Sequence, residues 1–495
     1  MGDGAYLPDR AAAWLERFFD PALALVRYPS GRGSPTNPYQ QPGVQVVRET
    51  ATLAVALLRR GASGDAARAE AALRAVIAHQ IDAPGSPADG TFRRSPRERL
   101  PGPAPREWID YDPNWREFVG TALALALRYA DALSPECVAA VEASLRRAAA
   151  GSFARGVSPE YTNIAVMGAF LLDFAGDRLG EGAWRRAADA LAAAVAEGYR
   201  RSGAFAEHNS PTYYGVDLYG LALWRARAPS ERLRALGAEL EAALWRDLAR
   251  FYHAGLANLC GPYTRAYGMD MTRYVAALGC WIAPLADASA APLPPLSDDA
   301  EHGHDFAELV WVGELGARPP DDVVADLRAF RGTRGVEQRI SDSPRRVATA
   351  RLEEGAMWGG EDSGARSIHW QHHPATLHWR RPDGAVGWLK LATPAPVDAS
   401  ADAGGLSAVV HAGIPWLRES AVPVWLELSH EPAAPLELRD GAVWDLAGLA
   451  LRVGVSARVL ARREPRRAGT SFEPGRAPRT LELRLAVEST PSARR

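Results

Sequence analysis

A single stretch of eighteen residues carries many of the side chains that could move protons. Residues 202–219 are Ser-Gly-Ala-Phe-Ala-Glu-His-Asn-Ser-Pro-Thr-Tyr-Tyr-Gly-Val-Asp-Leu-Tyr, which combine one imidazole, carboxylates, an amide and three phenols. Ser210-Pro211 is typical of a helix start, and an apolar pattern at helical spacing follows from Tyr214. The stretch therefore predicts a loop that presents His208 and a tyrosine at a helix N-terminus, where catalytic groups are often found.

Three further polar clusters lie between predicted helices, each near the start of one. They are Asp110-Tyr-Asp-Pro-Asn-Trp-Arg116, Glu160-Tyr-Thr-Asn163 and Gly261-Pro-Tyr-Thr-Arg-Ala-Tyr-Gly-Met-Asp270. In a ring of helical hairpins the loops at one end converge on a central cleft. We therefore expect clusters that are far apart in the sequence to share one site.

Structural roles compete with functional ones at these positions. Asn163 could cap a helix that starts at Ile164, because asparagine is a favoured N-cap residue. Arg265 stands between Tyr263 and Tyr267 and could be a cation stacked on their rings. The aromatic residues of the first cluster fit either a core or a sugar-stacking surface; they are Trp108, Tyr111 and Trp115.

The spacing of apolar residues predicts a succession of helices up to about residue 285. The predicted segments are 9–27, 45–61, 66–81, 115–132, 135–155, 162–176, 181–200, 212–227, 230–255 and 270–283. Segments 182–199 and 230–252 are rich in Ala, Leu, Arg and Glu, which are strong helix formers, and are predicted to form an outer layer. Ten helices in succession indicate paired hairpins.

The composition changes at Ala288, where a stretch rich in Pro, Ala and Asp indicates a linker. Short helices are predicted near 305–316 and 321–330. Beyond them the pattern is β-rich, with Pro382-Asp383-Gly384 as a hairpin turn. The predicted fold class is multidomain α+β, namely an (α/α) toroid of helical hairpins at 1–290, a linker with short helices at 291–330 and an antiparallel β-sandwich at 331–495.

The order of these parts and the polar residues within them resemble one group of enzymes. A helical domain with Asn163, then His208 and Tyr214, then Arg265, followed by a β-sandwich, is similar to the toroid-plus-sandwich polysaccharide lyases. That group includes the chondroitin AC, hyaluronate, alginate and heparinase II/III-like lyases. Gly203-Ala-Phe-Ala-Glu-His208 is similar to a Gly-Ser-Phe-x-x-His motif of these families, although the tyrosine spacing differs.

The resemblance implies cleavage of a glycosidic bond next to a uronic acid by β-elimination. Loss of the C5 proton builds negative charge on the carboxylate, which Asn163 and Arg265 would stabilise, while His208 and Tyr214 would transfer protons. The catalytic tyrosine is left open among Tyr213, Tyr214 and Tyr219. The expected substrate-binding residues are Trp108, Asp112, Asn114, Trp115, Glu207, Asn209, Tyr213, Tyr263 and Tyr267.

Two alternative functions remain open. A glycoside hydrolase on the same toroid would use two carboxylates, drawn from Asp110, Asp112, Glu160, Glu207, Asp217 and Asp270. A glycan-binding protein without catalysis would keep only the aromatic cleft. Both alternatives share the predicted fold and the carbohydrate partner.

No cofactor is expected, and the predicted reaction is independent of metal. The histidines of 369–378 permit a structural zinc at His369 and His373, but cross-strand polar pairs, or a histidine that reaches the cleft from the sandwich, explain them better. The sequence has no P-loop, GxSxG, HExxH or strand-linked GxGxxG motif, and a formal net charge of -2 with no basic stripe argues against nucleic-acid binding. The three cysteines, without CxxC, indicate neither a disulfide framework nor a cysteine metal site.

The expected partner is a uronate-containing poly- or oligosaccharide, without nucleic acid or membrane. The N-terminal segment lacks the charged and apolar regions of a signal peptide, so a cytoplasmic location is expected, although a processed secreted form would have the same sequence features. Oligomeric state, linkage and the particular uronate are not specified by the sequence.

Overall fold

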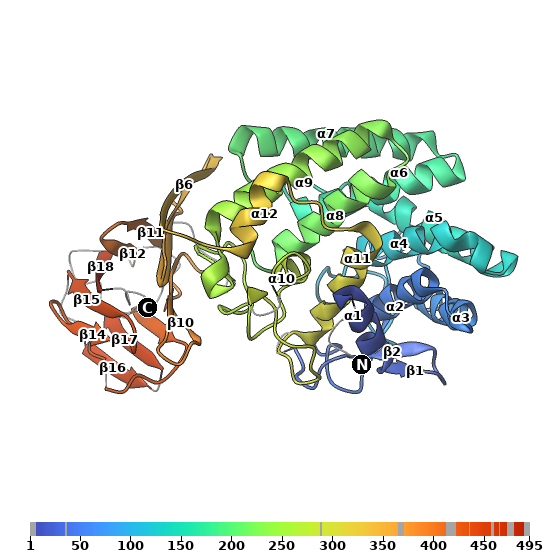
Figure 1. The fold of residues 1–495 in the computed structure, drawn as a ribbon. Coiled ribbons are helices and arrows are strands. Elements are labelled where there is room, and N and C mark those ends of the chain that lie inside the picture. The colour runs from blue at the N-terminus through green and yellow to red at the C-terminus, as the bar shows by residue number, and fades with distance from the viewer. Residues whose placement is uncertain are drawn as a thin grey trace.

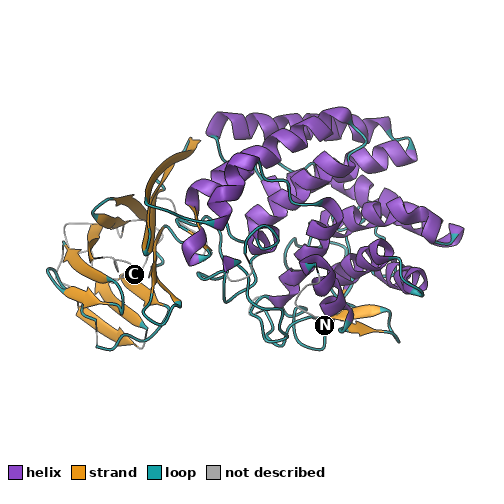
Figure 2. Ribbon diagram, in the orientation of Figure 1, coloured by secondary structure: helices purple, strands orange, loops and turns teal. Residues whose placement is uncertain are grey.

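The protein consists of a helical part followed by a part made of strands (Figures 1 and 2). The computed structural model describes residues 6–34, 37–287, 290–364, 371–411, 422–434, 436–456, 460–464, 466–472 and 480–489. The helical part extends to residue 328 and the long strands begin at residue 333. The predicted fold class, a helical toroid followed by an antiparallel sandwich, is confirmed.

An inner ring of helices forms the centre of the helical part. Its members are α2 (Val47–Arg60), α4 (Trp115–Ala126), α6 (Thr162–Leu179), α8 (Tyr213–Arg227), α10 (Ala277–Ile282) and α11 (Glu308–Leu315). Each of these helices packs against the next, and α11 returns to contact α2, so the ring closes. They are buried around most of their circumference, as a helix that is apolar on all sides requires.

Outer helices cover this ring as the second members of antiparallel hairpins. They are α3 (Asp65–Ile77), α5 (Pro135–Arg155), α7 (Gly182–Ser202) and α9 (Glu231–Phe251). Helix α7 buries one stripe, from Trp184 through Ala188 and Ala192 to Val195, and leaves its other face polar. The outer position predicted for α7 and α9 is confirmed, because one apolar stripe is what a surface helix buries. Helix α1 (Leu7–Glu16) packs on α11, and α12 (Asp321–Arg328) packs on α9.

Two predicted helices are shorter than the apolar pattern indicated. Helix α1 ends at Glu16, and a small sheet of β1 (Phe19–Asp20), β2 (Leu25–Arg27) and β3 (Gln45–Val46) follows. The segment 270–276 is not helical, and α10 begins at Ala277. In both places an aspartate accepts a hydrogen bond from the backbone N–H two residues later, at Ala22 and at Thr272. Such turns compete with helix formation.

The segment predicted as a linker, 291–330, contains a structural member of the ring. Helix α11 follows the 3-10 turn at Gly303–Ala307, and its Leu309 and Val310 are fully buried. The domain boundaries themselves stay predictions, but this piece is built into the helical core. Further short elements are 3-10 turns at Leu127–Ala132 and Ala254–Leu256 and the strand pair β4 (Tyr252–His253) and β5 (Asn258–Leu259).

Two antiparallel sheets face each other in the C-terminal part. One has the order β16-β17-β13-β10-β9-β8-β7-β6, with bounds Leu460–Glu464, Arg467–Phe472, Val422–Leu428, Val386–Ala392, Ala375–Arg380, Ala356–Asp362, Arg345–Glu353 and Thr333–Asp342. The other has the order β11-β12-β18-β15-β14, with bounds Val397–Asp402, Gly405–His411, Thr480–Ser489, Ala450–Val455 and Val443–Asp445.

The sandwich has its own core between the sheets. Trp358 and Leu377 of the first sheet pack in one apolar cluster with Val410 and Leu451 of the second. The predicted hairpin turn joins β9 to β10, with Gly384 at φ 81°. That left-handed conformation is one that glycine adopts without steric cost. Among the described helices, none has the length and apolar character needed to span a bilayer.

Candidate functional site

A cavity of about 340 Å³ lies at one end of the inner ring. The first turn of every helix of the ring contributes to its lining, with Arg48 from α2, Trp115 from α4, Asn163 from α6, Tyr213 from α8, Ala277 from α10 and Glu308 from α11. Helix N-termini carry unpaired N–H groups and the positive end of the helix dipole. The cavity therefore has an electrostatic preference for anionic groups, which its arginines reinforce.

Eight of the residues predicted from the sequence line this cavity. They are Asn163 and Arg265 of the expected catalytic set and Trp108, Asp112, Asn114, Trp115, Tyr213 and Tyr267 of the expected binding set. They come from four segments that span more than 150 positions of the chain. The expectation that the polar clusters converge on one cleft agrees with this placement.

In the cavity, the guanidinium group of Arg265 stacks on the ring of Tyr213. The guanidinium carbon of Arg265 lies 3.9 Å from the centre of the Tyr213 ring, and the Tyr213 hydroxyl is 3.3 Å from that of Tyr267. Burial raises the pKa of Tyr213 well above its usual value, and the Arg265 charge opposes this shift. Tyr213 is thus a neutral phenol at physiological pH. The expectation that Arg265 stacks on a ring agrees with this geometry, with Tyr213 as the ring.

The side chain of Asn163 has one buried hydrogen-bond acceptor that no described residue uses. Asn163 occupies the second position of α6, which begins at Thr162, so it is not the residue that caps this helix. Its Oδ1 is buried and has no hydrogen-bond partner among the described residues. A buried amide without a partner is costly, and such groups deserve a functional explanation. The explanation of Asn163 as a simple N-cap is therefore wrong.

Beside Asn163, a chain of polar contacts fixes the wall formed by α4 and α6. The Asn114 side-chain amide donates to the Tyr161 hydroxyl at 2.8 Å, and Arg155 donates to the Asn114 Oδ1 at 2.8 Å. Tyr161 lines the cavity but was not predicted as a site residue, although it belongs to the 160–163 cluster. Such contacts hold the wall rigid, which favours a preorganised site.

His208 and Tyr214, the expected proton carriers, do not line the cavity. Both are fully buried, with the Tyr214 hydroxyl 3.1 Å from His208 Nδ1 and donating to Asp247 Oδ2 at 2.8 Å. Burial lowers the pKa of His208 to about 3 and raises that of Asp247 to about 6. The placement corrects the preference for Tyr214, because its neighbour Tyr213 is the tyrosine in the cavity. Tyr219 donates to Thr121 at 2.9 Å and is also buried.

Three of the expected binding residues form hydrogen bonds within segments that lead to the cavity. The Asn209 side-chain amide donates to the carbonyls of Cys260 and Pro262, both at 2.7 Å. The Tyr263 hydroxyl donates to the carbonyl of Leu259, so both residues hold the loop that leads to Arg265. The remaining residue, Glu207, is buried and accepts from Thr162 at the start of α6. None of the three is among the lining residues of the cavity.

The carboxylates expected for a hydrolase are scattered. Of the six, Asp112 lines the cavity, whereas Asp110 is ion-paired with Arg106 at 3.1 Å and Asp270 is bound within its own loop. Glu160 is exposed. Asp217 and Glu207 are buried neighbours, and burial together with Glu207 raises the pKa of Asp217 well above its usual value. This pair is behind the cavity wall and does not flank a space for a sugar.

A further group of ionisable residues in the cavity was not predicted from the sequence. His302, His304 and Asp305 line the cavity with Arg48 and Glu308. Burial lowers the pKa of His302 to about 4 and that of His304 to about 3, and it raises that of Glu308 to about 8. The His-Gly-His-Asp sequence at 302–305 was a detectable signal. The Pro- and Ala-rich composition just before this segment is typical of a linker and hides that signal. Arg94 also lines the cavity and was missed.

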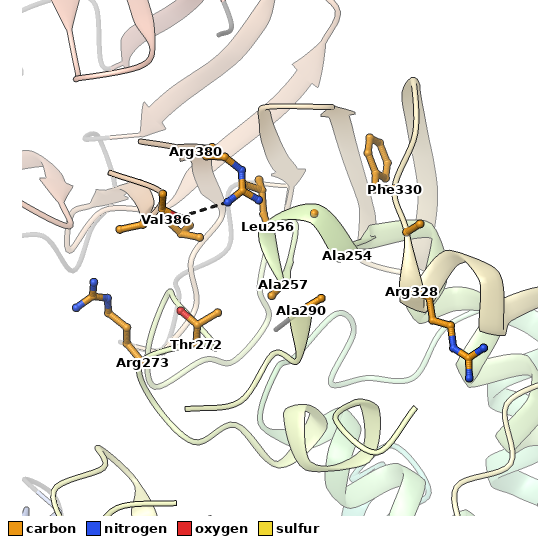
Figure 3. A pocket seen from close by; sticks show the side chains of 14 residues that line it. Ala254, Leu256, Ala257, Thr272, Arg273, Ala290, Arg328, Phe330, Arg380 and Val386 are labelled. Atoms are coloured by element: carbon orange, nitrogen blue, oxygen red, sulfur yellow. Dashed lines mark hydrogen bonds between the residues drawn. The ribbon is translucent and has the colours of Figure 1, made fainter. Parts of the chain in front are cut away.

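A second cavity lies where the helical part meets the sandwich (Figure 3). Its volume is about 440 Å³, and its lining includes Arg273, Arg328 and Arg380 but none of the expected site residues. In Figure 3 the Arg273 and Arg328 side chains extend away from the centre of this group. The junction cavity therefore lacks the convergent polar groups that the ring cavity has.

The sandwich nevertheless reaches the ring cavity through one loop. Tyr263 and His373 pair through their backbones, and the Arg265 Nε donates to the side chain of Gln371 at 2.9 Å. The predicted zinc ligand His373 is buried against Tyr263, and burial lowers its pKa well below its usual value. His369, the other predicted ligand, lies outside the described residues.

Comparisons with solved structures find chains that are similar to this one over nearly its whole length. Among solved structures the chain is similar to heparinase III, with 10% identity, a TM-score of 0.48, and coverage of 98% of this chain and 86% of that one. It is also similar to the chondroitin AC lyase of Streptomyces coelicolor A3 in complex with chondroitin sulphate, with 13% identity, a TM-score of 0.48, and coverage of 99% and 79%.

A search of curated proteins gives no match. A family model matches residues 6–314, which include the whole inner ring and the 302–305 segment of the cavity. Because this match covers well over half of the chain, the protein belongs to the family described as a domain of unknown function, DUF8769.

Proposed function

We propose that the protein is a carbohydrate lyase that cleaves a glycosidic bond next to a uronic acid by β-elimination in the ring cavity. The observation that carries the proposal is that Asn163, Arg265 and Tyr213 line one cavity. An amide, a guanidinium and a phenol are the groups that this reaction needs. The first two stabilise the charge on the carboxylate and the third moves a proton.

The carboxylate of the sugar would be held by Arg265 and Asn163. Removal of the C5 proton shifts an electron pair toward the carboxylate, so donors placed there stabilise the transition state more than the ground state. The N-termini of the ring helices add partial positive charge at the same end of the cavity. Asn163 lines the cavity together with Arg265, and the N–H groups of its side-chain amide would be the donors for this role.

Two of the phenols that line the cavity, Tyr213 and Tyr267, would carry the protons. The C5–H bond breaks, the C4–C5 double bond forms and the C4–O4 bond breaks, so one proton must leave C5 and one must reach the departing O4. Tyr213 is kept protonated by its burial and is suited to donate to O4. Tyr267 would accept the C5 proton as its phenolate and so become a phenol, and its proton would then pass back to Tyr213 across the 3.3 Å between the two hydroxyls.

The aromatic rim fits a sugar ring. Trp108 is half exposed at the cavity and stands at φ 67°, a left-handed conformation that is uncommon for a bulky residue. Trp115 is buried deeper in the lining. Tryptophan faces at the mouth and wall of a polar cavity would bind the apolar face of a sugar. We therefore propose a uronate-containing poly- or oligosaccharide as the substrate.

The hydrolase alternative has less support, because five of its six candidate carboxylates do not line the cavity. The glycan-binding alternative shares the cavity and differs only in turnover. Product analysis separates all three. The purified protein is incubated with a panel of uronate polymers and oligomers, and ultraviolet absorbance and reducing ends are followed together.

A lyase gives an unsaturated uronate, so absorbance and new chain ends rise in parallel. New reducing ends without absorbance would indicate a hydrolase and overturn the proposal. Saturable binding of a panel member, measured by calorimetry, with no product of either kind would indicate a glycan-binding protein instead.

A further inference from the structure

The wall of the ring cavity next to Tyr267 holds three metal-ligating side chains in one group. The side chains of His302, His304 and Asp305 each offer a ligand atom, and these atoms all lie within 4.8 Å of one another. All three residues line the cavity. We propose that they bind a divalent transition metal ion of the zinc class, with an open coordination position toward the cavity.

The spacing of the donor atoms fits such an ion. Ligand atoms about 2.0–2.1 Å from a tetrahedral zinc lie roughly 3.3 Å from one another. His304 Nε2 and Asp305 Oδ1 are 3.3 Å apart. The His302 ring stacks on Tyr267, with ring centroids 4.6 Å apart, and its ligand atom lies within 4.8 Å of those of the other two residues. Two imidazoles and one carboxylate leave a fourth position open, and imidazole donors favour zinc over magnesium or calcium.

A partner outside the ligand set orients His304. The Tyr28 hydroxyl lies 2.7 Å from His304 Nδ1. When the Nδ1 proton is donated to the Tyr28 oxygen, the Nε2 lone pair faces Asp305. Metal-binding histidines almost always have their second ring nitrogen held in this way, which fixes the tautomer and the ring. Tyr28 is thus a positioning residue.

The charges around the group also favour a cation. Arg48 makes an ion pair with Glu49 at 2.9 Å and lies 3.8 Å from Asp305. Glu308 is 8% exposed and lines the cavity, and its Oε2 has no hydrogen-bond partner among the described residues. Glu49 and Asp305 therefore share one guanidinium. A divalent ion would add positive charge beside Asp305, and the unpartnered Glu308 oxygen is available to a water on that ion.

A metal ion at this wall differs from the metal-independent reaction expected from the sequence. That expectation concerned the histidines of the sandwich and not His302 and His304. Metal binding at this wall also does not depend on the proposed lyase activity. A metal at this wall would bind an oxygen atom of whatever occupies the cavity, whether a substrate or a simple glycan ligand. Its test accordingly measures metal binding and not turnover.

The test uses the full chain after removal of metals with a chelator and dialysis. Zinc chloride is titrated in by calorimetry, and cobalt chloride is followed by visible absorption, which reports low-symmetry coordination with nitrogen donors. We expect one ion per chain. His302→Gln and Asp305→Asn should each weaken zinc binding by more than about 100-fold, because loss of an outer partner alone costs about 10- to 100-fold.

Tyr28→Phe should weaken zinc binding by about 10- to 100-fold, shift its pH dependence, and leave the stoichiometry unchanged. A matched control is His411→Gln, which breaks a similar pair, His411 Nε2 to Asp398 Oδ2 at 2.8 Å, in the sandwich. Far-ultraviolet circular dichroism of each metal-free variant checks folding.

Absence of stoichiometric zinc binding would overturn the proposal. So would equal affinity in the wild type and both ligand variants, or a loss of binding in His373→Gln that His302→Gln does not share. The last result would place the ion in the sandwich. A cobalt spectrum typical of hexaaqua cobalt would likewise exclude imidazole ligands.

Discussion

Tyr213 and Tyr214 are neighbours in the chain and have opposite environments. The Tyr213 hydroxyl faces Tyr267 in the cavity, whereas the Tyr214 hydroxyl is buried between His208 and Asp247. Successive residues of a helix point about 100° apart, so a one-residue uncertainty in where α8 begins exchanges the two roles. The sequence could therefore predict a tyrosine at this helix start but not which one lines the cavity.

The two tyrosines give the first prediction. Tyr213→Phe should lower turnover by about 100- to 10,000-fold, because it removes a proton carrier while the ring still stacks under Arg265. Tyr214→Phe should keep turnover within a few-fold in the folded protein and should destabilise it by about 1–3 kcal/mol, because Asp247 loses a donor. Turnover on the active uronate substrate and urea unfolding are measured for both. Near-native turnover of Tyr213→Phe would contradict the role of this residue.

Asp247 gives a prediction on pH. Burial raises its pKa from 3.8 to about 6. A carboxyl with a raised pKa contributes stability that is fully present below pH 3.8 and is lost as the pH rises through 6. Asp247→Asn cannot ionise, so its stability relative to wild type should rise by about 3 kcal/mol between pH 3.5 and 7. Urea unfolding of both proteins across this range gives the difference, and parallel curves would argue against an ionisable Asp247 in the fold.

The helices of the ring were largely predictable as elements. Their apolar residues recur at three- and four-residue spacing and Gly or Pro separates them, so α2 to α9 were expected close to their observed bounds. The exceptions are segments where a hydrogen bond from the backbone to a local side chain favours a turn over a helix, as at Asp20 and Asp270. Helix α11 was predicted as a helix but not as a member of the ring, because closure of the ring depends on contacts with α2 that are about 250 positions away.

Glycines on α8 determine how closely the ring helices approach. A Cβ atom on Gly215 would lie 2.3 Å from the Ala277 carbonyl carbon and 2.4 Å from the Leu278 nitrogen, both backbone atoms of α10. Gly215→Ala should therefore destabilise the protein by about 1–3 kcal/mol through overpacking. Chemical denaturation measures this change.

Gly198→Ala on the outer helix α7 is the matched control. A Cβ atom there meets nothing within 4 Å. The substitution should stabilise the protein by about 0.5–1 kcal/mol, because glycine is a poor residue for a helix interior. If both variants lost stability equally, the close packing of α8 on α10 would not be the cause.

At the scale of the molecule, the helical part and the sandwich are in contact at Arg265, one of the arginines that line the ring cavity. Gln371, from the segment before β9, accepts a hydrogen bond from Arg265, and its backbone carbonyl accepts from Ala266. The two parts and their order follow from the change of hydrophobic period near residue 331. The contact between Arg265 and Gln371 cannot be predicted in this way, because it joins residues 106 positions apart and no local pattern encodes it.

Gln371→Ala should consequently affect the site from a distance. Arg265 would lose a partner that fixes its guanidinium over Tyr213, so we expect KM for an acidic substrate to rise about 10-fold, with a smaller fall in kcat. Gln371→Glu should restore most of the affinity by keeping an acceptor for Arg265. An unchanged KM in Gln371→Ala would show that stacking on Tyr213 suffices to hold the guanidinium.

The backbone pairing of Tyr263 with His373 extends this contact, through bonds of 2.9 and 3.0 Å in both directions. The loop that carries Arg265 therefore pairs with the sandwich through its backbone, as an edge strand pairs with a sheet. Unfolding of the sandwich would take away hydrogen-bond partners of that loop, and loss of the loop would expose the sandwich at the same place. Calorimetric melting should accordingly show a single cooperative transition, and a ligand of the ring cavity should delay the melting of strands that it never touches.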